Sequence, residues 1–174
     1  MKMGVLWLSA APLWLLGCGG GSGAFPGSAT DLDDLGRAVV FALNEGDEAT
    51  LASFRLSEAE HNEVVWPELS AARSENPYTL EFAWQNIQLR DRRAVGRLTH
   101  DLAPLVPMVY EATECRGETQ AFETFQVRTD CYVRFSSSGA LYEVQFFKDV
   151  LERGGGHKIF RYYDETPRKI AGMD

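Results

Sequence analysis

The stretch from residue 125 to residue 146 reads FQVRTDCYVRFSSSGALYEVQF, and its hydrophobic residues recur at every second position. A period of two is typical of a β-strand that buries one face and exposes the other. The small residues at 136–139 interrupt the pattern and indicate a turn. The stretch therefore predicts two antiparallel strands, one over residues 125–135 and one over residues 142–146.

Two further strands flank this pair. A glycine turn at residues 154–156 precedes a short hydrophobic run at 159–163, and another hydrophobic stretch covers residues 105–115. We expect these four strands to form one antiparallel meander. Residues 116–130 are either the turn of a hairpin near Gly117 or a longer loop.

Helical patterns fill the chain before these strands. A helix is expected from Thr30 to the glycine at residue 46, with acidic residues in its first turn, and a short one follows at 47–54. A capping-box pattern at residues 57–60 opens a third helix, which Trp66-Pro67 closes. The longest helix restarts at Asn76-Pro77 and carries one apolar side as far as Leu102. This order predicts an α+β fold with N-terminal helices packed on a four-stranded antiparallel meander.

Composition excludes several classes of function. The 174 residues carry a net charge of −8 and a pI near 4.9, whereas a nucleic-acid partner requires a basic surface. The sequence contains no phosphate-binding loop, no Cys-x-x-Cys and no His-Glu-x-x-His, and its three histidines fall on different predicted elements. We therefore expect no cofactor, no metal and no nucleic acid.

The N-terminus has the layout of a secretory signal. Lys2 provides a positive charge and residues 5–16 are almost entirely apolar. Twelve helical residues extend about 18 Å, too short for a hydrocarbon core of about 30 Å. The segment therefore predicts an exported protein, without a transmembrane helix.

The quartet Leu15-Leu16-Gly17-Cys18 resembles the lipobox of bacterial lipoproteins. The resemblance implies a signal peptide over residues 1–17, cleavage before Cys18, diacylglycerol on its thiol and an acyl chain, commonly palmitate, on the new amino terminus. Gly19 follows where an aspartate would favour the inner membrane, so the resemblance points to the outer membrane, facing the periplasm or the cell surface. Leu16 is bulkier than the small residue usual at its place.

Residues 18–30 would then form the lipidated cysteine and a flexible Gly/Ser linker, and residues 31–174 a single domain. Loss of Lys2 leaves 16 basic and 25 acidic side chains, so the mature chain carries a net charge of −9. Anionic head groups repel such a domain, and the lipid itself must hold it at the membrane.

Cys115 and Cys131 remain as candidates for a disulfide, because an oxidising compartment favours pairing. A hairpin turning near Gly117 would place them about 30 Å apart at about 3.3 Å per residue. A loop over residues 116–130 would allow the bridge. Without it, both are small buried apolar residues.

Two fold-level resemblances add expectations. Helices followed by a curved sheet resemble the nuclear transport factor two-like folds, which implies a cone-shaped sheet enclosing a pocket. The segment Trp66-Pro67-Glu68-Leu69 resembles one found in uncharacterised bacterial proteins. Neither resemblance assigns a catalytic residue.

Asp91 is the leading candidate for chemistry. On the long helix it falls on the apolar side, where a carboxylate is costly unless it is paired. It could be a pocket acid or base, aided by His61 or Tyr110. Alternatively, it forms a salt bridge to Arg128 or Arg134, or lies at the edge of a bent helix.

Other candidates have a structural interpretation beside the functional one. His61 shares a helix face with valines and suits a buried position. The long helix carries arginines that could form a basic patch, but they spread over much of its polar side, which favours a solvated face; they are Arg90, Arg92, Arg93 and Arg97. The aromatic residues around the start of that helix either line a hydrophobic mouth or pack in the core; they are Trp66, Tyr78, Phe82 and Trp84. For a pocket we single out Trp66, Trp84 and Tyr110 as lining residues.

Two functional hypotheses follow. The first is a membrane-anchored envelope lipoprotein with a non-catalytic domain that binds a protein partner or a small apolar ligand. The second is a small pocket enzyme of the isomerase, dehydratase or hydrolase type that uses Asp91.

Overall fold

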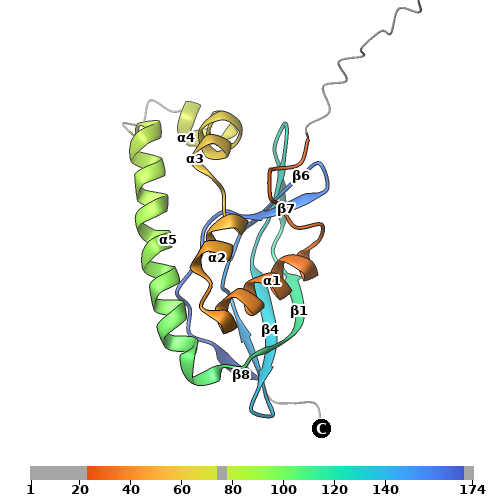
Figure 1. Ribbon diagram of the computed structural model, residues 1–174. Helices are drawn as coiled ribbons and strands as arrows, with labels where there is room; N and C mark the ends of the chain where they lie inside the picture. Colours follow the sequence, from red (N-terminus) through yellow and green to blue (C-terminus); the bar gives the residue numbers. More distant parts are fainter. Residues whose placement is uncertain (1–22, 74–77, 171–174) are drawn as a thin grey trace, which may run out of the picture.

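The chain folds as an α+β protein in which helices come first and two antiparallel sheets follow (Figure 1). The structure is a computed structural model that describes residues 23–73 and 78–170. The helical elements are α1 (Leu32–Glu45), α2 (Glu48–Phe54), α3 (Glu58–Glu60), the π-helix η1 (His61–Val65), the 3₁₀-helix η2 (Trp66–Glu68), α4 (Ser70–Arg73), α5 (Leu80–Leu102) and the 3₁₀-helix η3 (Ala103–Leu105). The strands are β1 (Val109–Cys115), β2 (Thr119–Ala121), β3 (Gln126–Arg128), β4 (Cys131–Ser137), β5 (Ala140–Val144), β6 (Val150–Arg153), β7 (Gly156–Ile159) and β8 (Arg168–Ile170).

The strands divide into two four-stranded sheets, whereas the sequence pattern predicts one meander. The first sheet has the order β1-β4-β5-β8 and the second the order β2-β3-β6-β7. Neither sheet is closed or curled, so the expected cone-shaped sheet is not formed. The prediction was wrong here because alternation reports that a strand buries one face, and does not report which sheet the strand joins.

One long hairpin links the two sheets. The part near the open end of the hairpin pairs β1 with β4, and the part near its turn pairs β2 with β3. The chain reverses at residues 122–125, where the Phe122 N–H donates to the Phe125 carbonyl at 2.9 Å. Between the two parts Asp130 has a φ of 56°, and a Cβ on Gly117 would lie 2.2 Å from Thr129 Oγ1. The expected strand over 125–135 is therefore bent at Asp130 and split between the sheets.

This hairpin places Cys115 directly opposite Cys131, and the two form a disulfide. The distance of about 30 Å that follows from a turn near Gly117 does not apply, since the turn lies farther along the chain, at 122–125. A disulfide between β1 and β4 fits an extracytoplasmic protein.

The helices follow the sequence pattern closely. Helix α1 begins after Asp31, whose side chain accepts the Asp34 N–H at 2.7 Å, and ends at Gly46, which has a φ of 64°. Helix α5 is a single helix of 23 residues that ends before Pro104. Its N-cap is Thr79, so the helix begins at Leu80, later than the expected start at Asn76-Pro77, which lies outside the described residues.

Two clusters of buried side chains hold the layers together. The larger one joins α1 and α5 to the inner face of β4 and β5, through residues such as Leu35, Leu98 and Phe135. The smaller one contains Phe25, Leu56, Val65, Phe125 and Leu151. The N-terminal half of α5 contacts the segment after α3 separately, through the rings of Trp84 and His61, whose centroids are 5.2 Å apart.

The folded body begins earlier than the sequence predicts. Phe25 is only 2% exposed, and Ala29 exchanges backbone hydrogen bonds with His157 of β7 at 2.9 and 3.0 Å. Residues 25–29 therefore belong to the domain, because Phe25 fills a place in the smaller core. The linker expected over residues 18–30 therefore does not include residues 25–29, while the expected signal peptide and Cys18 lie outside the described residues.

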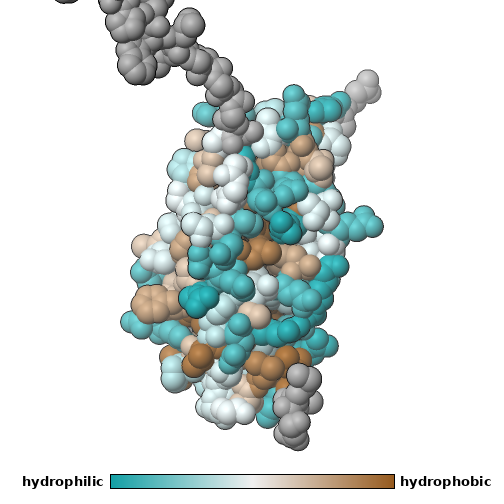
Figure 2. Space-filling view, turned by 90° about the vertical axis from the view of Figure 1, so that its right-hand side faces the viewer, coloured by the Kyte–Doolittle hydropathy of each residue, from teal (hydrophilic) through white to brown (hydrophobic). Residues whose placement is uncertain are grey.

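Within residues 23–73 and 78–170, no helix combines the length and the hydrophobicity needed to cross a bilayer. Figure 2 views the molecule from the side turned away from α5, where hydrophilic residues dominate and hydrophobic ones gather in small groups.

Candidate functional site

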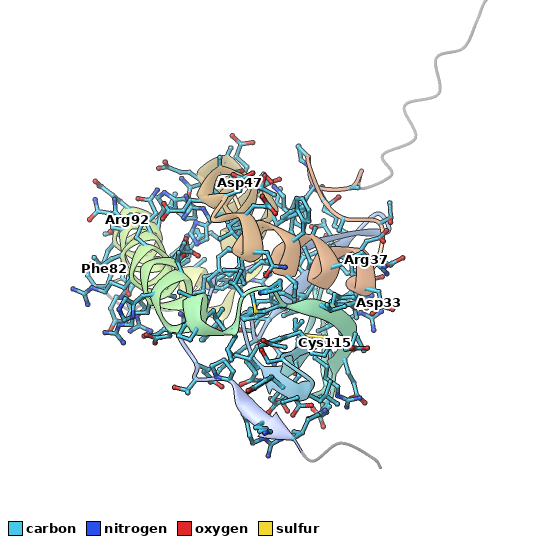
Figure 3. All side chains as sticks on the ribbon, turned by 60° about the horizontal axis from the view of Figure 1, so that its bottom comes forward. Asp33, Arg37, Asp47, Phe82, Arg92 and Cys115 are labelled. Atoms are coloured by element: carbon cyan, nitrogen blue, oxygen red, sulfur yellow. A yellow bond between two sulfur atoms is a disulfide. The ribbon has the colours of Figure 1, made fainter. Side chains whose placement is uncertain are left out.

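An aromatic pocket lies between the N-terminal half of α5 and the segment running from η1 to α4. Its volume is about 360 Å³, within the range of small-molecule sites. Five rings line it and give it an apolar wall: His61, Trp66, Tyr78, Phe82 and Phe160. Tyr78 and Phe82 stack on each other with their ring centroids 5.3 Å apart, and both are about half exposed. Phe82 projects from the outer side of α5 in Figure 3.

A buried ion pair joins α3 to β7, close in sequence to pocket residues on both sides. Lys158 of β7 donates to both carboxylate oxygens of Glu60, at 2.8 and 2.9 Å, and both side chains are almost completely buried. The Ser57 N–H donates to the same carboxylate at 2.7 Å, which completes the expected capping box. Glu60 thus joins the start of α3 to the second sheet.

His61 follows Glu60 directly and opens the π-helical turn η1. Such turns are rare and occur frequently at functional sites. The His61 side chain is buried between two indole rings, with centroid distances of 5.9 Å to Trp66 and 5.2 Å to Trp84. Burial lowers the pKa of His61, so the imidazole is mainly neutral at pH 7, and Nδ1 donates to Asn62 Oδ1 at 2.7 Å.

The three expected lining residues have different positions. Trp66 lines the aromatic pocket, and Trp84 is buried behind His61, where its Nε1 has no acceptor among the described residues. Tyr110 lies elsewhere, on β1. Its hydroxyl donates to Asp33 of α1, and burial together with that carboxylate raises its pKa. Figure 3 shows Asp33 beside Arg37, whose guanidinium lies 5.2 Å from the Tyr110 ring centroid.

Asp91 lines a second, smaller pocket of about 300 Å³ between α2 and α5. It is 1% exposed, and both of its oxygens are engaged: one accepts the Tyr162 N–H at 2.9 Å and the other pairs with Arg55. The expected partners are bound elsewhere, Arg128 to Glu152 and Arg134 to Glu143. Sequence reasoning missed Arg55 because it is 36 residues away and lies just after α2.

The structure does not bring the three catalytic candidates together. Asp91 and His61 line different pockets, and Tyr110 lies on β1 against α1. In the described part of the chain, no group of three His, Cys, Asp or Glu side chains could hold a metal ion. Asp91, His61 and Tyr110 therefore do not form one acid–base site, and the aromatic pocket is suited to binding an apolar body.

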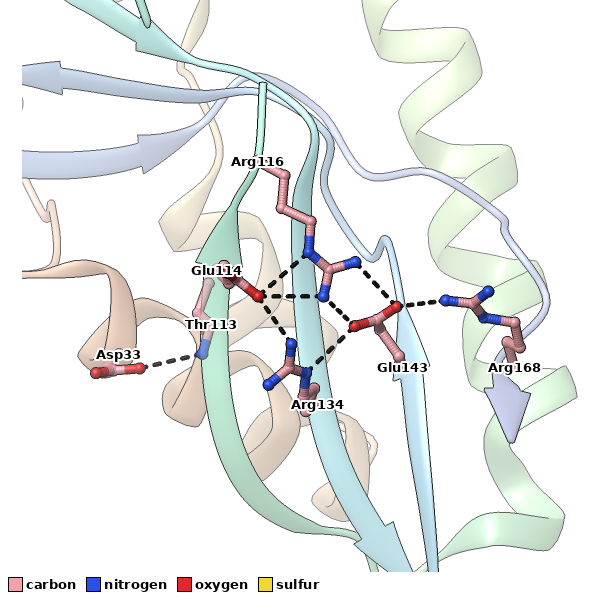
Figure 4. Close-up of polar contacts among 7 residues, drawn as sticks. All are labelled: Asp33, Thr113, Glu114, Arg116, Arg134, Glu143 and Arg168. Carbon is pink, nitrogen blue, oxygen red and sulfur yellow. Dashed lines mark hydrogen bonds and ion pairs between the residues drawn. The ribbon is translucent and has the colours of Figure 1, made fainter. Parts of the chain in front are cut away.

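A charged cluster on the outer face of the first sheet surrounds Glu143 (Figure 4). Three arginines contact this carboxylate, which is 3% exposed: Arg116, Arg134 and Arg168. Glu114 pairs with the first two of them. Hydrogen bonds from Arg116, followed by those from Arg168 and Arg134, lower the pKa of Glu143 to about 2. Each charged group of this cluster pairs with another member of it. The cluster thereby links β1, β4, β5 and β8.

This cluster predicts a pH dependence of stability. The folded-state pKa of Glu143 lies below the unfolded value of about 4.3, so its contribution is complete above that value and is lost as the pH falls towards 2. Glu143→Gln should lower the free energy of unfolding by about 2 kcal/mol at pH 6 and by much less at pH 2.5. Urea titrations at both pH values measure this difference. Glu114→Gln, at a half-exposed carboxylate of the same cluster, should have a smaller effect, and a pH-independent difference for Glu143→Gln would contradict the argument.

Comparisons with models of protein families, with curated proteins and with solved structures find no match for this chain.

Proposed function

We propose that this protein is a lipid-anchored lipoprotein of the bacterial envelope whose α+β domain binds a ligand without catalysing a reaction. The observation that carries the proposal is the lipobox-like quartet Leu15-Leu16-Gly17-Cys18, placed directly after an apolar segment and directly before a glycine-rich one. The disulfide between Cys115 and Cys131 supports an oxidising compartment. Gly19 after the cysteine supports the outer membrane.

The aromatic pocket supports the binding part of the proposal. It is concave and mostly apolar, with a few polar groups at its edge, as ligand sites usually are. Its exposed rings, Tyr78 and Phe82, provide contact area for an apolar body.

The alternative, a pocket enzyme based on Asp91, receives less support. A general base needs an oxygen within hydrogen-bond reach of the substrate proton. Both oxygens of Asp91 accept hydrogen bonds from the chain itself, one from Arg55 and one from the Tyr162 N–H. These bonds attach α5 to the end of α2 and to the segment after β7. We therefore assign Asp91 a structural role.

The anchoring is tested by fractionating cells that produce the full-length protein or its Cys18→Ala variant. The unsubstituted protein should sediment with outer-membrane fractions, resist washing with high salt and be released by detergent, because acyl chains hold it. Mass spectrometry should find a chain that begins at Cys18 and carries diacylglycerol and an acyl group. The variant should keep residues 1–17 and lack the lipid. An unmodified Cys18 in a chain recovered without membranes would refute the anchoring.

A further inference from the structure

The charged groups around the aromatic pocket all have the same sign. Arg90 of α5 and Arg161, just after β7, line it, whereas none of its lining residues is an aspartate or a glutamate. The chain as a whole has more acidic than basic residues and a net charge of −8, whereas this cavity is lined by two arginines and no acidic residue. The pocket is a local cationic site on an acidic protein.

Arg90 is available to a ligand. It is exposed, and among the residues that the structure describes no side chain or backbone group pairs with it. Arg97, two turns farther along α5, instead pairs with Asp164. A guanidinium has five N–H donors in a planar fork that matches a carboxylate.

Arg161 is held in place by its own neighbours. The Arg161 guanidinium lies 3.6 Å from the ring centroid of Tyr163, and its Nη1 donates to the Tyr162 carbonyl at 3.2 Å. Stacking on an aromatic ring leaves the edge of the fork free for further hydrogen bonds. Arg161 therefore offers a positioned donor at the edge of the pocket.

The geometry points to a ligand class: we propose that the aromatic pocket binds an organic monoanion with a flat apolar body, such as an aryl carboxylate. The body lies among the rings of Trp66, Tyr78 and Phe82, and the carboxylate faces Arg90 and Arg161. This inference rests on the proposed binding function and specifies its ligand. An organic cation would meet two like charges, and a neutral analogue would leave the donors without an acceptor.

The test uses three probes that share one apolar body and differ in charge: 2-naphthoate, 2-naphthylmethylammonium and 2-naphthalenemethanol. Isothermal titration calorimetry on the purified full-length protein in detergent should give a dissociation constant for 2-naphthoate at least about tenfold below those of the other two, because hydrogen bonds to charged groups are strong. Phe82→Ala should weaken the binding of 2-naphthoate and of 2-naphthalenemethanol by similar factors, which places both in the pocket.

Arg90→Gln is the decisive variant. It should raise the dissociation constant of 2-naphthoate about tenfold and leave that of 2-naphthalenemethanol within twofold. Arg93→Gln is the matched control, because Arg93 is exposed on the same helix, has no partner among the described residues and does not line the pocket. Thermal melts of both variants verify that they are folded.

Three outcomes would overturn the inference: equal affinity for the three probes, equal effects of Arg90→Gln and Arg93→Gln on 2-naphthoate, or no binding of 2-naphthoate. If 2-naphthalenemethanol binds as tightly as 2-naphthoate, the pocket still binds apolar bodies and only the preference for an anion falls. If none of the probes binds, the inference falls while the membrane anchoring stays open to its own test.

Discussion

Replacing Lys158 by methionine is expected to lower the free energy of unfolding by about 3–5 kcal/mol. Lys158 Nζ contacts both oxygens of Glu60, and the two side chains are only 5% and 8% exposed. The substitution leaves the Glu60 carboxylate buried and without its ion-pair partner. The measurement is equilibrium unfolding in urea at pH 7, followed by circular dichroism.

Two further variants separate the loss of a charge from the loss of packing. Glu60→Gln/Lys158→Met removes both charges and keeps an acceptor for the Ser57 N–H, so it should recover at least half of the stability that the single variant loses. Lys169→Met, at an exposed lysine of β8, should change stability by less than about 0.5 kcal/mol. A loss for Lys158→Met no greater than that for Lys169→Met would show that the buried pair does not form.

The second large effect is expected from removing the disulfide. Cys115 and Cys131 are separated by 16 residues, and closing a loop of this size stabilises a protein by about 3 kcal/mol in the chain-entropy description. The double variant Cys115→Ala/Cys131→Ala should therefore unfold at a lower urea concentration than the oxidised protein. Its free energy of unfolding should be lower by about 3 kcal/mol. Cys131 is also completely buried, so its replacement by alanine leaves a small cavity in the core.

Reduction provides the matched comparison. Dithiothreitol should shift the unfolding midpoint of the unsubstituted protein towards that of the double variant and leave the double variant unchanged. Coincident midpoints for the oxidised and the reduced protein would contradict the expected contribution.

The helical part of the fold was predictable because its signals are local. The end of α1 at Gly46, the capping box of α3 and the apolar side of α5 depend on residues at most four positions apart, whereas the N-cap of α1 is Asp31, one residue after the expected Thr30. The sheets were less predictable for two reasons. Gly117 suggests a turn, yet it is required there because Thr129 approaches its backbone closely. The true reversal, at residues 122–125, contains neither glycine nor proline.

The candidate site was predictable to the extent that it lies on neighbouring segments. Trp66, Tyr78 and Phe82 flank the start of α5 in the sequence, so a hydrophobic mouth could be considered from their spacing. Phe160 and Arg161 could not be assigned to it, because they reach the pocket from the far end of the chain through the pairing of β6 with β7. The sequence pattern predicts a solvated face for Arg90, which agrees with its exposure, but does not predict its place at the pocket.

If Cys18 carries the proposed lipid, the burial of Phe25 limits how far the domain can lie from the membrane. A chain spans at most about 3.3–3.6 Å per residue, so the seven steps from Cys18 to Phe25 cover no more than about 25 Å however they are arranged. With an acyl group on Cys18, the domain would remain within roughly its own diameter of the bilayer. A ligand of the aromatic pocket would then be bound only within this layer beside the bilayer.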